Sequence, residues 1–467
     1  MQYFRPGGNQ FVGDCMPFSH CGRFHLYYLL DEGHHQALGG LGGHQWAHTS
    51  SVDLLHWTHH PLALPITESW EGSICTGSVI YDKGEFYAFY ATRQRDRTQQ
   101  VRVARSADGV HFVKPTDTVP LLLPPPGYAP IDFRDPFVWR GDDGVFHLLV
   151  TANHEAPALF ERGGTLLRYW SHDLRHWMPD DAPFLVPGGE PGYKSVPECP
   201  DLFHWGEWYY LLFGLGLQTH YRMARSPDSE WLRPPVDTLD TPWNAVIKTA
   251  SWGDDRRIGV GWIPWRAGET ADGAWQWGGN AVFRELVRHE DGTLGTRFVG
   301  EMTSYTTPIS PSVTVLTLGG TADPETIFLP RHLPQAVVAL DDLPSDFRLC
   351  VRVVPESGAT TFGIGLRGTG NFERSVQLRF YPYQKRVVLG GEATLYNVAG
   401  LCEPFDLEII VQGDIADVCM DNRRCVLGRV GKDGGSRLFF WSEASGVRWE
   451  DFRVYTLHAT ASPPFVG

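Results

Sequence analysis

Aromatic and aliphatic residues recur in a regular pattern over the first three hundred residues. Four glycines each precede a run of apolar residues, at 22–30, 84–92, 144–152 and 206–214, and a weaker fifth unit begins at residue 256. Each of the four runs is followed by a Ser-x-Asp segment, and the serines are 55, 65 and 55 residues apart. This period is typical of a four-stranded propeller blade. The pattern predicts a five-bladed β-propeller over residues 1–300, with the Ser-x-Asp segments serving as turns.

The pattern changes after residue 300. Residues 301–314 are rich in Ser, Thr and Pro, which is typical of a linker. From residue 315 to residue 467, short runs alternate between apolar and polar residues, as in 347–354 and 405–412. Alternation with a period of two, interrupted by turns, is typical of antiparallel strands with one buried face. The sequence therefore predicts an all-β protein, in which a C-terminal β-sandwich follows the propeller.

Composition restricts the function classes. The chain has 54 acidic and 40 basic residues, a formal charge of −14, which argues against binding to nucleic acid or to an anionic membrane. No run of about 18 apolar residues predicts a membrane span, and no secretory signal is visible, so we expect a cytoplasmic protein. None of the eight cysteines forms a Cys-x-x-Cys pair, and we expect reduced thiols. The expected partner is a neutral carbohydrate.

Three carboxylates stand where the repeat is broken. Asp14, Asp135 and Glu198 precede the glycines of their units by 8, 9 and 8 residues. Equivalent positions in successive blades lie at one depth around the axis, so the spacing predicts a ring of three carboxylates. Such groups repel one another and are partly desolvated, so one should stay protonated while another is ionised. Glycoside cleavage requires this combination.

Two other interpretations of these carboxylates remain open. Three carboxylates are also suited to a cation such as calcium, although the neighbouring Arg134 opposes that interpretation. A purely structural role, in which the three carboxylates stabilise turns, is the other alternative. The His-rich stretch 31–48 matches no zinc-ligand spacing, so we expect no metal and no cofactor.

The surroundings of Glu198 suggest how it is oriented. Pro197 and Pro200 flank it, and proline restricts both its own φ angle and the residue before it. We expect this segment to be extended, with Glu198 pointing toward the axis. Strand alternation then predicts that Cys199 points away from the axis, as a small buried thiol.

Several stretches together resemble glycoside hydrolase family 32, the invertase, inulinase and levanase group. The matching stretches are Phe-Arg-Asp-Pro at 133–136, Glu-Cys-Pro at 198–200, and the segments 44–57, 75–90, 278–286 and 413–430. They cover almost the whole chain, and the resemblance implies a five-bladed propeller joined to a β-sandwich. One motif departs from the family, because Gly13-Asp14-Cys15 stands in place of Asn-Asp-Pro. Leu29 and Leu30 also stand where the family has a Gln.

The resemblance implies a role for each carboxylate in a retaining β-fructofuranosidase. Asp14 is implied as the nucleophile, Glu198 as the acid/base and Asp135 as the transition-state stabiliser, with Arg134 orienting Asp135 and contacting the sugar. The expected substrates are fructo-oligosaccharides, fructans or sucrose-like sugars. Further residues are candidates for apolar floors under sugar rings or for hydrogen bonds to the sugar: His44, Gln45, Trp46, Trp70, Ser78 and Trp139.

The altered first motif leaves other activities open. One alternative is a related propeller enzyme, either a pentofuranosidase such as an arabinofuranosidase or a fructosyltransferase. The other is a carbohydrate-binding protein without catalytic activity. Turnover of a furanoside would distinguish either enzyme from the binding protein.

Overall fold

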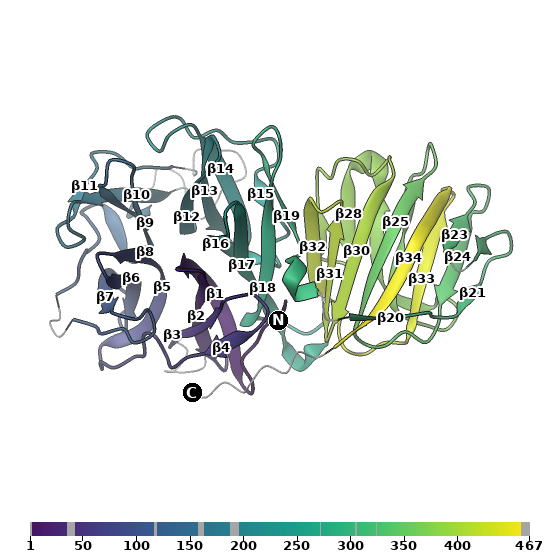
Figure 1. Ribbon diagram of the computed structural model, residues 1–467, viewed down its shortest axis with the longest axis horizontal. Coiled ribbons are helices and arrows are strands. Elements are labelled where there is room, and N and C mark those ends of the chain that lie inside the picture. Colours follow the sequence, from purple (N-terminus) through teal and green to yellow (C-terminus); the bar gives the residue numbers. More distant parts are fainter. Residues whose placement is uncertain are drawn as a thin grey trace.

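The structure is a computed structural model that describes residues 2–34, 43–115, 119–156, 163–186, 196–270, 272–303, 306–323 and 325–458. Figure 1 shows two lobes side by side, with β1–β19 in one and β20–β34 in the other. Strands dominate both lobes, as the sequence predicts. The described helices are short 3-10 turns: η3 (Ala267–Glu269), η4 (Gly300–Thr303) and η5 (Pro382–Gln384).

Three of the sheets in the first lobe are formed by strands consecutive in the chain. Their strands are β5 (Glu71–Asp82), β6 (Glu85–Gln94), β7 (Gln99–Ser106); β8 (Tyr128–Arg140), β9 (Phe146–His154), β10 (Gly164–Ser171), β11 (Met178–Pro179); and β12 (Glu198–Trp205), β13 (Trp208–Leu215), β14 (Gln218–Ala224), β15 (Thr238–Leu239). Antiparallel hairpins join the strands within each sheet. Each sheet therefore forms from one segment of the chain.

The fourth sheet of this lobe joins its two ends. It contains β1 (Gln10–His20), β2 (Arg23–Glu32), β3 (Gln45–Ser51), β4 (Trp57–His59), β16 (Ala245–Trp252), β17 (Arg256–Arg266), β18 (Trp275–Arg288) and β19 (Leu294–Arg297). The N-terminal strand β1 pairs with β18 where Val12 faces Gly279. This pairing holds the beginning of the lobe against its end.

Five strands contact one another in a ring. β1 contacts β5, β5 contacts β8, β8 contacts β12, β12 contacts β16, and β16 contacts β1. Each of the five has a β-bulge, where its register with the next strand of its sheet shifts. The bulges lie between the paired residues Val12 and Cys15, Ile74 and Gly77, Arg134 and Phe137, Glu198 and Asp201, and Ala245 and Lys248. Each bulge thus contains the two residues between its named pair. Since β-bulges redirect side chains, these residues can point in directions that regular strands do not allow.

The aromatic runs found in the sequence form the second strand of each sheet or sheet half, namely β2, β6, β9, β13 and β17. Their side chains are buried, as Tyr28 and Tyr210 illustrate. The Ser-x-Asp segments are turns, as predicted. In the first, the hydroxyl of Ser51 donates to Asp53, whose carboxylate accepts the backbone N–H of Leu55 and of His56. The repeat at Ser106 and the repeat at Ser171 make the same bonds.

The second lobe consists of two antiparallel sheets around one apolar core. One sheet contains β20 (Thr306–Ile309), β22 (Thr321–Ala322), β23 (Thr326–Leu329), β25 (Phe347–Pro355), β30 (Phe405–Gln412), β31 (Ile415–Met420), β32 (Arg424–Arg429) and β34 (Val447–Leu457). The other contains β21 (Val313–Val315), β24 (Gln335–Leu340), β26 (Thr361–Thr369), β27 (Arg374–Tyr381), β28 (Arg386–Leu389), β29 (Ala393–Leu395) and β33 (Arg437–Glu443). Phe362 and Trp449 meet edge to face in the core.

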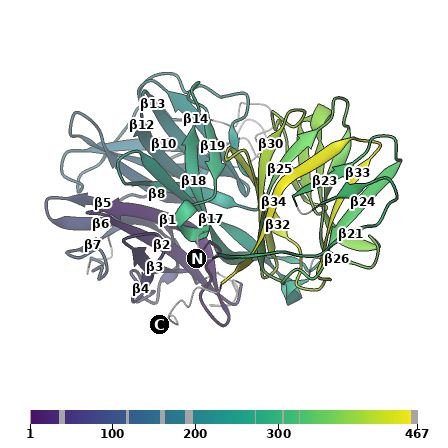
Figure 2. The same cartoon turned by 45° about the vertical axis from the view of Figure 1, so that its right-hand side comes forward.

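The two lobes are in direct contact. β32 of the second lobe contacts β19 of the first, and both views show β32 at the edge of the second lobe that faces the first lobe (Figures 1 and 2). The buried guanidinium of Arg284 on β18 donates to Asp417 on β31 at 2.8 Å. Part of the predicted linker belongs to the second lobe, because β20 pairs with β34 and β21 pairs with β24. All eight cysteines lie in the described ranges and are free thiols. No helix in those ranges is long and apolar enough to cross a membrane.

Candidate active site

The carboxylate of Asp14 lies in the β1 bulge and accepts hydrogen bonds from an indole and from a hydroxyl group. The indole N–H of Trp262 donates to Oδ1 at 2.9 Å, and the hydroxyl of Thr76 donates to Oδ2 at 2.7 Å. Trp262 belongs to β17, and Thr76 lies in the bulge of β5. Two neighbouring sheets therefore hold this carboxylate in one orientation. The sequence analysis missed both donors.

Asp135 lies in the β8 bulge with a φ of 56°, in the left-handed region. Its side chain is buried, and Oδ2 accepts the backbone N–H of Cys199 at 3.0 Å. Burial raises the pKa of Asp135, the nearby Arg134 lowers it, and the charge of Asp14 raises it. Aspartate tolerates positive φ better than most residues, so the bulge is compatible with a carboxylate here.

Glu198 is the first residue of β12, and its side chain is about one third exposed (34%). Its Oε1 accepts hydrogen bonds from Arg134, 2.9 Å from Nη2 and 3.2 Å from Nε. Burial raises the pKa of Glu198 to about 7; Arg134 opposes this shift, and the charges of Asp135 and Asp14 add to it. The carboxyl group therefore exchanges its proton close to neutral pH.

Arg134 connects the acidic groups. Besides its bonds to Glu198, it donates from Nη1 to Asp132 at 2.7 Å, and its Nε lies 3.8 Å from Asp135 Oδ2. Burial lowers the pKa of Arg134, but the charges of Glu198, Asp135 and Asp132 raise it by more than burial lowers it. The guanidinium group therefore stays cationic. Asn153 donates to the other oxygen of Asp132 and completes the network.

The predicted orientation of Cys199 is wrong. Its Sγ lies 3.6 Å from Oδ2 of Asp14 and 3.5 Å from Oδ2 of Asp135, so the thiol faces the carboxylates instead of pointing away. The β12 bulge interrupts the alternation of side chains, and Cys199 has a φ of 50°. The thiol is buried, as expected, and burial raises its pKa well above the usual range. It is a neutral group between two carboxylates.

The structure thus brings Asp14, Asp135 and Glu198 together, but not at equivalent positions. Glu198 is the last paired residue before its bulge, Asp135 is the first residue in its bulge and Asp14 is the second. Their similar spacing hides this offset for two reasons. The glycines used for the count hold different positions in their turns, and the strand and turn lengths after the bulges differ. The three side chains extend from three successive strand positions. Asp14 and Asp135 contact the Cys199 thiol, and Asp135 and Glu198 lie at the Arg134 guanidinium.

Gly13 stands directly before Asp14, and the ring of Trp277 occupies the space that a side chain at residue 13 would need. A Cβ atom at this position would lie 2.0 Å from the ring of Trp277 on β18. Trp277 also stacks on His44 at 4.3 Å and lies 5.1 Å from the ring of Trp262. The departure from the Asn-Asp-Pro motif therefore coincides with an aromatic ring that fills this space. Leu29 and Leu30, the other departure, are buried core residues.

The residues predicted to bind sugar are placed differently from one another. His44 is buried 3.7 Å from Asp31, and Gln45 accepts the backbone N–H of Ile66, which fastens the adjoining loop. Trp46 is fully buried, and its indole N–H donates to the carbonyl of Cys75. Part of the His-rich stretch, residues 35–42, lies outside the described residues.

The interactions of Trp70, Ser78 and Trp139 are with groups other than the three carboxylates. The guanidinium of Arg102 covers the ring of Trp70 at 4.3 Å. The Ser78 hydroxyl donates to the carbonyl of Pro136 and accepts the N–H of Val138, and so joins β5 to β8. Trp139 and Ser78 both line a cavity of about 260 Å³ to which all five ring strands contribute. Their contact with a substrate stays a prediction.

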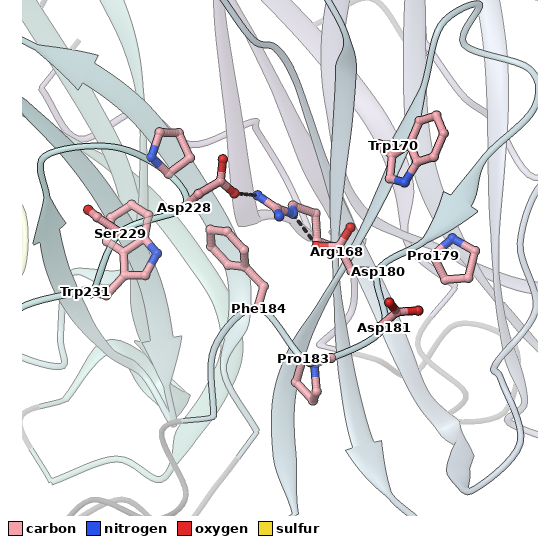
Figure 3. A pocket seen from close by; sticks show the side chains of 12 residues that line it. Arg168, Trp170, Pro179, Asp180, Asp181, Pro183, Phe184, Asp228, Ser229 and Trp231 are labelled. Carbon is pink, nitrogen blue, oxygen red and sulfur yellow. Dashed lines mark hydrogen bonds and ion pairs between the residues drawn. The ribbon is translucent and has the colours of Figure 1, made fainter.

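A second cavity, of about 610 Å³, lies between β10 and β11 of one sheet and the segment that follows β14 of another sheet (Figure 3). At its centre Arg168 forms ion pairs with Asp180 and Asp228, each at 2.6 Å. Trp170 lies on one side and Trp231 on the other. None of the predicted site residues lines this cavity. Among the described residues, no group of three His, Cys, Asp or Glu side chains is arranged to hold a metal ion.

Comparisons with known proteins agree with the resemblance found in the sequence. Residues 15–293 match the model of the glycosyl hydrolases family 32 N-terminal domain. A sucrose-6-phosphate hydrolase of Escherichia coli is 32% identical over 200 residues, which cover 41% of this chain and 38% of that protein. A raffinose invertase of Escherichia coli is 27% identical over 317 residues, which cover 62% of this chain and 63% of that protein. The chain thus spans roughly two fifths to two thirds of these relatives.

Solved structures with the same fold cover nearly the whole chain. Fructan 1-exohydrolase IIa from Cichorium intybus superposes with a TM-score of 0.75 at 17% identity, over 98% of this chain and 97% of that chain. Sucrose-6-phosphate hydrolase from Lactobacillus gasseri gives a TM-score of 0.71 at 15% identity, over 98% and 92% of the two chains. The family model covers more than half of the sequence, and the chain belongs to glycosyl hydrolase family 32.

Proposed function

We propose that the protein is a retaining glycoside hydrolase that cleaves β-fructofuranosides, such as fructo-oligosaccharides, fructans or sucrose-like sugars. The observation that carries the proposal is the meeting of Asp14, Asp135 and Glu198 around one thiol and one guanidinium. Membership of family 32 supports it, as do the names of relatives: sucrose-6-phosphate hydrolase, raffinose invertase and levanbiose-producing levanase.

In this proposal Glu198 is the general acid. With a pKa of about 7, its carboxyl group is mostly protonated at mildly acidic pH and protonates the leaving oxygen as the glycosidic bond breaks. Asp14, held by Trp262 and Thr76, attacks the anomeric carbon and forms a glycosyl-enzyme intermediate. Glu198 then takes a proton from water, which hydrolyses the intermediate.

Asp135 and Arg134 bind the sugar and stabilise positive charge. Asp135 accepts hydrogen bonds from ring hydroxyls, and its negative charge favours the oxocarbenium-like transition state. Arg134 keeps Asp135 in place and donates to sugar oxygens. In a fructoside the anomeric carbon is tertiary, so the cation is comparatively accessible and assisted departure of the leaving group is the main task.

The proposal extends to the subsite and to the architecture. His44, Gln45, Trp70, Ser78 and Trp139 are proposed to surround the substrate, and Trp277 joins them through its packing on Gly13. Trp46 is fully buried, so its role is proposed to be support of the neighbouring residues instead of contact with the sugar. The first lobe is proposed to be a five-bladed β-propeller formed by residues 1–300. The bulged ring strands are its innermost strands. The second lobe is proposed to be a β-sandwich that includes β20 and β21, so the connecting segment is shorter than the predicted residues 301–314.

A panel of substrates tests the activity. Purified protein is incubated with aryl β-fructofuranosides, aryl arabinofuranosides, sucrose, sucrose 6-phosphate and fructo-oligosaccharides, and products are followed by chromatography and NMR. We expect the wild type to cleave fructosides and to release fructose with retained anomeric configuration. The Asp14→Ala variant, which lacks the nucleophile, should lose at least about 1,000-fold in kcat while its circular dichroism spectrum stays unchanged. Turnover of arabinosides alone, or of no substrate, contradicts the proposal; a wild-type rate in Asp14→Ala contradicts the role of Asp14.

A further inference from the structure

Lys248 is a buried lysine at the centre of the five ring strands. It lies on β16, is 2% exposed, and ends the bulge of that strand. It also lines the 260 Å³ cavity, together with residues of β1, β5, β8, β12 and β17. A buried ammonium group is costly unless charges and hydrogen bonds compensate it. Its presence here therefore requires an explanation, and the proposed mechanism gives it no role.

The ammonium group is bonded to the bulges of two other strands. Nζ donates to the carbonyl of Gly77 at 3.1 Å and to the carbonyl of Pro200 at 3.0 Å. Gly77 follows Thr76, which donates to Asp14, and Pro200 follows Cys199, which contacts both Asp14 and Asp135. Nζ also lies 5.2 Å from the ring centre of Phe137 on β8. One side chain thus connects the backbone segments that carry or support the carboxylates.

We propose that Lys248 is a positioning residue of the candidate active site. Its ammonium group holds the β5 and β12 bulges in register with each other and places a positive charge near Asp135, so that Asp135 stays ionised while Glu198 carries a proton. This role rests on the proposed function, because it concerns the charge states that the hydrolysis requires.

The charges around Lys248 favour this role. It opposes the burial that raises the pKa of Asp135 and of Cys199, and it acts in the same way on Asp201 of β12. Arg257 of β17 lines the same cavity, but its partners are Asp201 and Thr249. The cavity residues from β1 and β5 carry no titratable group.

Asp135 itself faces several other charged or titratable groups. These are Arg134 on its own strand, Asp14 of β1, Cys75 of β5, and Glu198 and Cys199 of β12. Arg134 is shared with Glu198 and Asp132, so it does not serve Asp135 alone. Lys248 is the cation that approaches Asp135 from β16, and it has no hydrogen bond to a carboxylate in the described part of the chain.

Two variants separate the charge of Lys248 from its hydrogen bonds. Lys248→Gln and Lys248→Arg both keep N–H donors for the two carbonyls, but only Arg keeps the charge. The measurement is the pH profile of kcat/KM on an aryl β-fructofuranoside. Its acidic limb reports the carboxylates that must be ionised, and its alkaline limb reports Glu198. In Lys248→Gln the pKa of Asp135 rises, so we expect the acidic limb to move up by about one pH unit while the alkaline limb stays. In Lys248→Arg the acidic limb stays.

Arg257→Gln is the matched control, because it removes another, half-buried cation from the same cavity, and this cation is not among the charges that act on Asp135. We expect its acidic limb to coincide with that of the wild type. If Lys248→Gln does not fold, Lys248→Met, uncharged and of similar volume, replaces it. An unchanged acidic limb in the neutral variants of Lys248, or an equal shift in Arg257→Gln, overturns the proposal.

A titration without substrate separates this proposal from the proposed function. In protein labelled with ¹³C at the aspartate carboxyl carbons, the signal of Asp135 is assigned by its loss in Asp135→Asn and followed with pH. We expect its midpoint to rise by about one unit in Lys248→Gln, whether or not any furanoside is cleaved. The same midpoint in the wild type and in Lys248→Gln overturns the role of Lys248. Absence of turnover with a shifted midpoint contradicts only the proposed function.

Discussion

At the scale of single residues, Glu198 combines two opposing influences. Burial raises its pKa to about 7, while two N–H groups of Arg134 bind the oxygen Oε1 and favour its ionised form. If Arg134 bound Glu198 more weakly, the pKa would be higher and the carboxyl group would be too weak an acid to donate its proton. If Arg134 bound it more strongly, the pKa would be lower and the group would be ionised before the substrate arrives. The balance matches a group that donates a proton in one step and accepts one in the next.

The first prediction concerns the leaving group in Glu198→Gln. We expect this variant to lose at least about 1,000-fold in kcat on fructo-oligosaccharides, because their alkoxide leaving groups need a proton. An aryl fructoside, whose phenolate leaves without help, should release its aryl group at a substantial rate. The second step then limits turnover, and added azide should increase it by attacking the intermediate. Stopped-flow absorbance of the released phenol measures both effects.

The pH profile is the control for this prediction. In the wild type, kcat/KM on fructo-oligosaccharides should fall tenfold per pH unit above about pH 7, because Glu198 loses its proton there. On the aryl substrate, Glu198→Gln should lack this alkaline limb. Equal losses on both substrates, with no effect of azide, would show that Glu198 binds the sugar or supports the site instead of donating a proton.

The second prediction concerns the contact between Gly13 and Trp277. In Gly13→Ala the new methyl group would lie 2.0 Å from the indole ring, which must move and disturb its stacking on His44 and its contact with Trp262, the donor to Asp14. We expect kcat to fall more than tenfold and the free energy of unfolding to fall by about 1–3 kcal/mol. Steady-state kinetics and urea unfolding measure the two effects. Gly7→Ala, where a Cβ meets nothing within 4 Å, is the control. Wild-type kinetics in Gly13→Ala would contradict a role for this contact.

At the scale of elements, the bulges of the five ring strands determine the site. Regular pleating would direct every second side chain to the same face, and Glu198, Asp135 and Asp14 would not approach one another from three successive positions. The left-handed φ angles of Asp135, Cys199 and Val246, at the equivalent first bulge position of three strands, are the local cost of this arrangement.

The third prediction tests a bulge directly. A Cβ atom on Gly77 would lie 1.8 Å from the backbone oxygen of Phe89 on the neighbouring strand β6. Backbone atoms in a paired strand cannot move aside as a flexible side chain can, so Gly77→Ala should lower the free energy of unfolding by about 2–3 kcal/mol. Gly391→Ala, with open space around its Cβ, should change it by less than about 0.5 kcal/mol. Urea unfolding compares the two; equal stabilities would show that the β5 bulge adapts.

At the scale of the whole molecule, a buried ion cluster joins the two lobes. Arg284 of β18 binds Asp240 at 2.6 Å and Asp417 of β31 at 2.8 Å, and the Tyr3 hydroxyl also donates to Asp417. The Arg284, Asp240 and Asp417 side chains are fully buried (0% exposed). The second lobe therefore supplies a charge that the first lobe needs, and we expect the lobes to unfold together.

The fourth prediction concerns Arg284→Met, which leaves two carboxylates buried without their cation. We expect the free energy of unfolding to fall by about 3–5 kcal/mol. Arg352→Met, in a surface pair with Asp406, should change it by less than about 1 kcal/mol. Thermal unfolding followed by circular dichroism measures both variants.

The sign of the pH dependence follows from Asp417. Burial raises its pKa and Arg284 lowers it, so removal of Arg284 raises the folded-state pKa further above the unfolded value. A carboxylate with a raised folded-state pKa costs stability once the pH exceeds the unfolded value. The deficit of Arg284→Met should therefore be smaller at pH 5 than at pH 8. A deficit independent of pH would show that the loss comes from packing alone.

Much of the architecture was predictable from the sequence because its signals are local. A glycine before an aromatic run predicts a turn followed by a buried strand, and these strands are β2, β6, β9 and β13, with β17 as the weaker fifth. The Ser-x-Asp turns form within a few residues and were interpreted correctly. The stretch 301–314 was harder to interpret. Its composition resembles a linker, whereas β20 and β21 are strands because partners far along the chain, β34 and β24, pair with them.

For the site, the sequence by itself determined which carboxylates interrupt the repeat, and its motifs identified the family. Tertiary structure decided how they meet, because a β-bulge shifts register through pairing with another strand, and a spacing count cannot reveal the shift. It turned Cys199 toward Asp14 and Asp135, packed Trp277 onto Gly13, and placed Lys248 between bulges 171 and 48 residues away in the chain. The physical reason is range: turns and strands depend on neighbouring residues, whereas burial, charge and contact at the site depend on segments that only the closed ring of strands brings together.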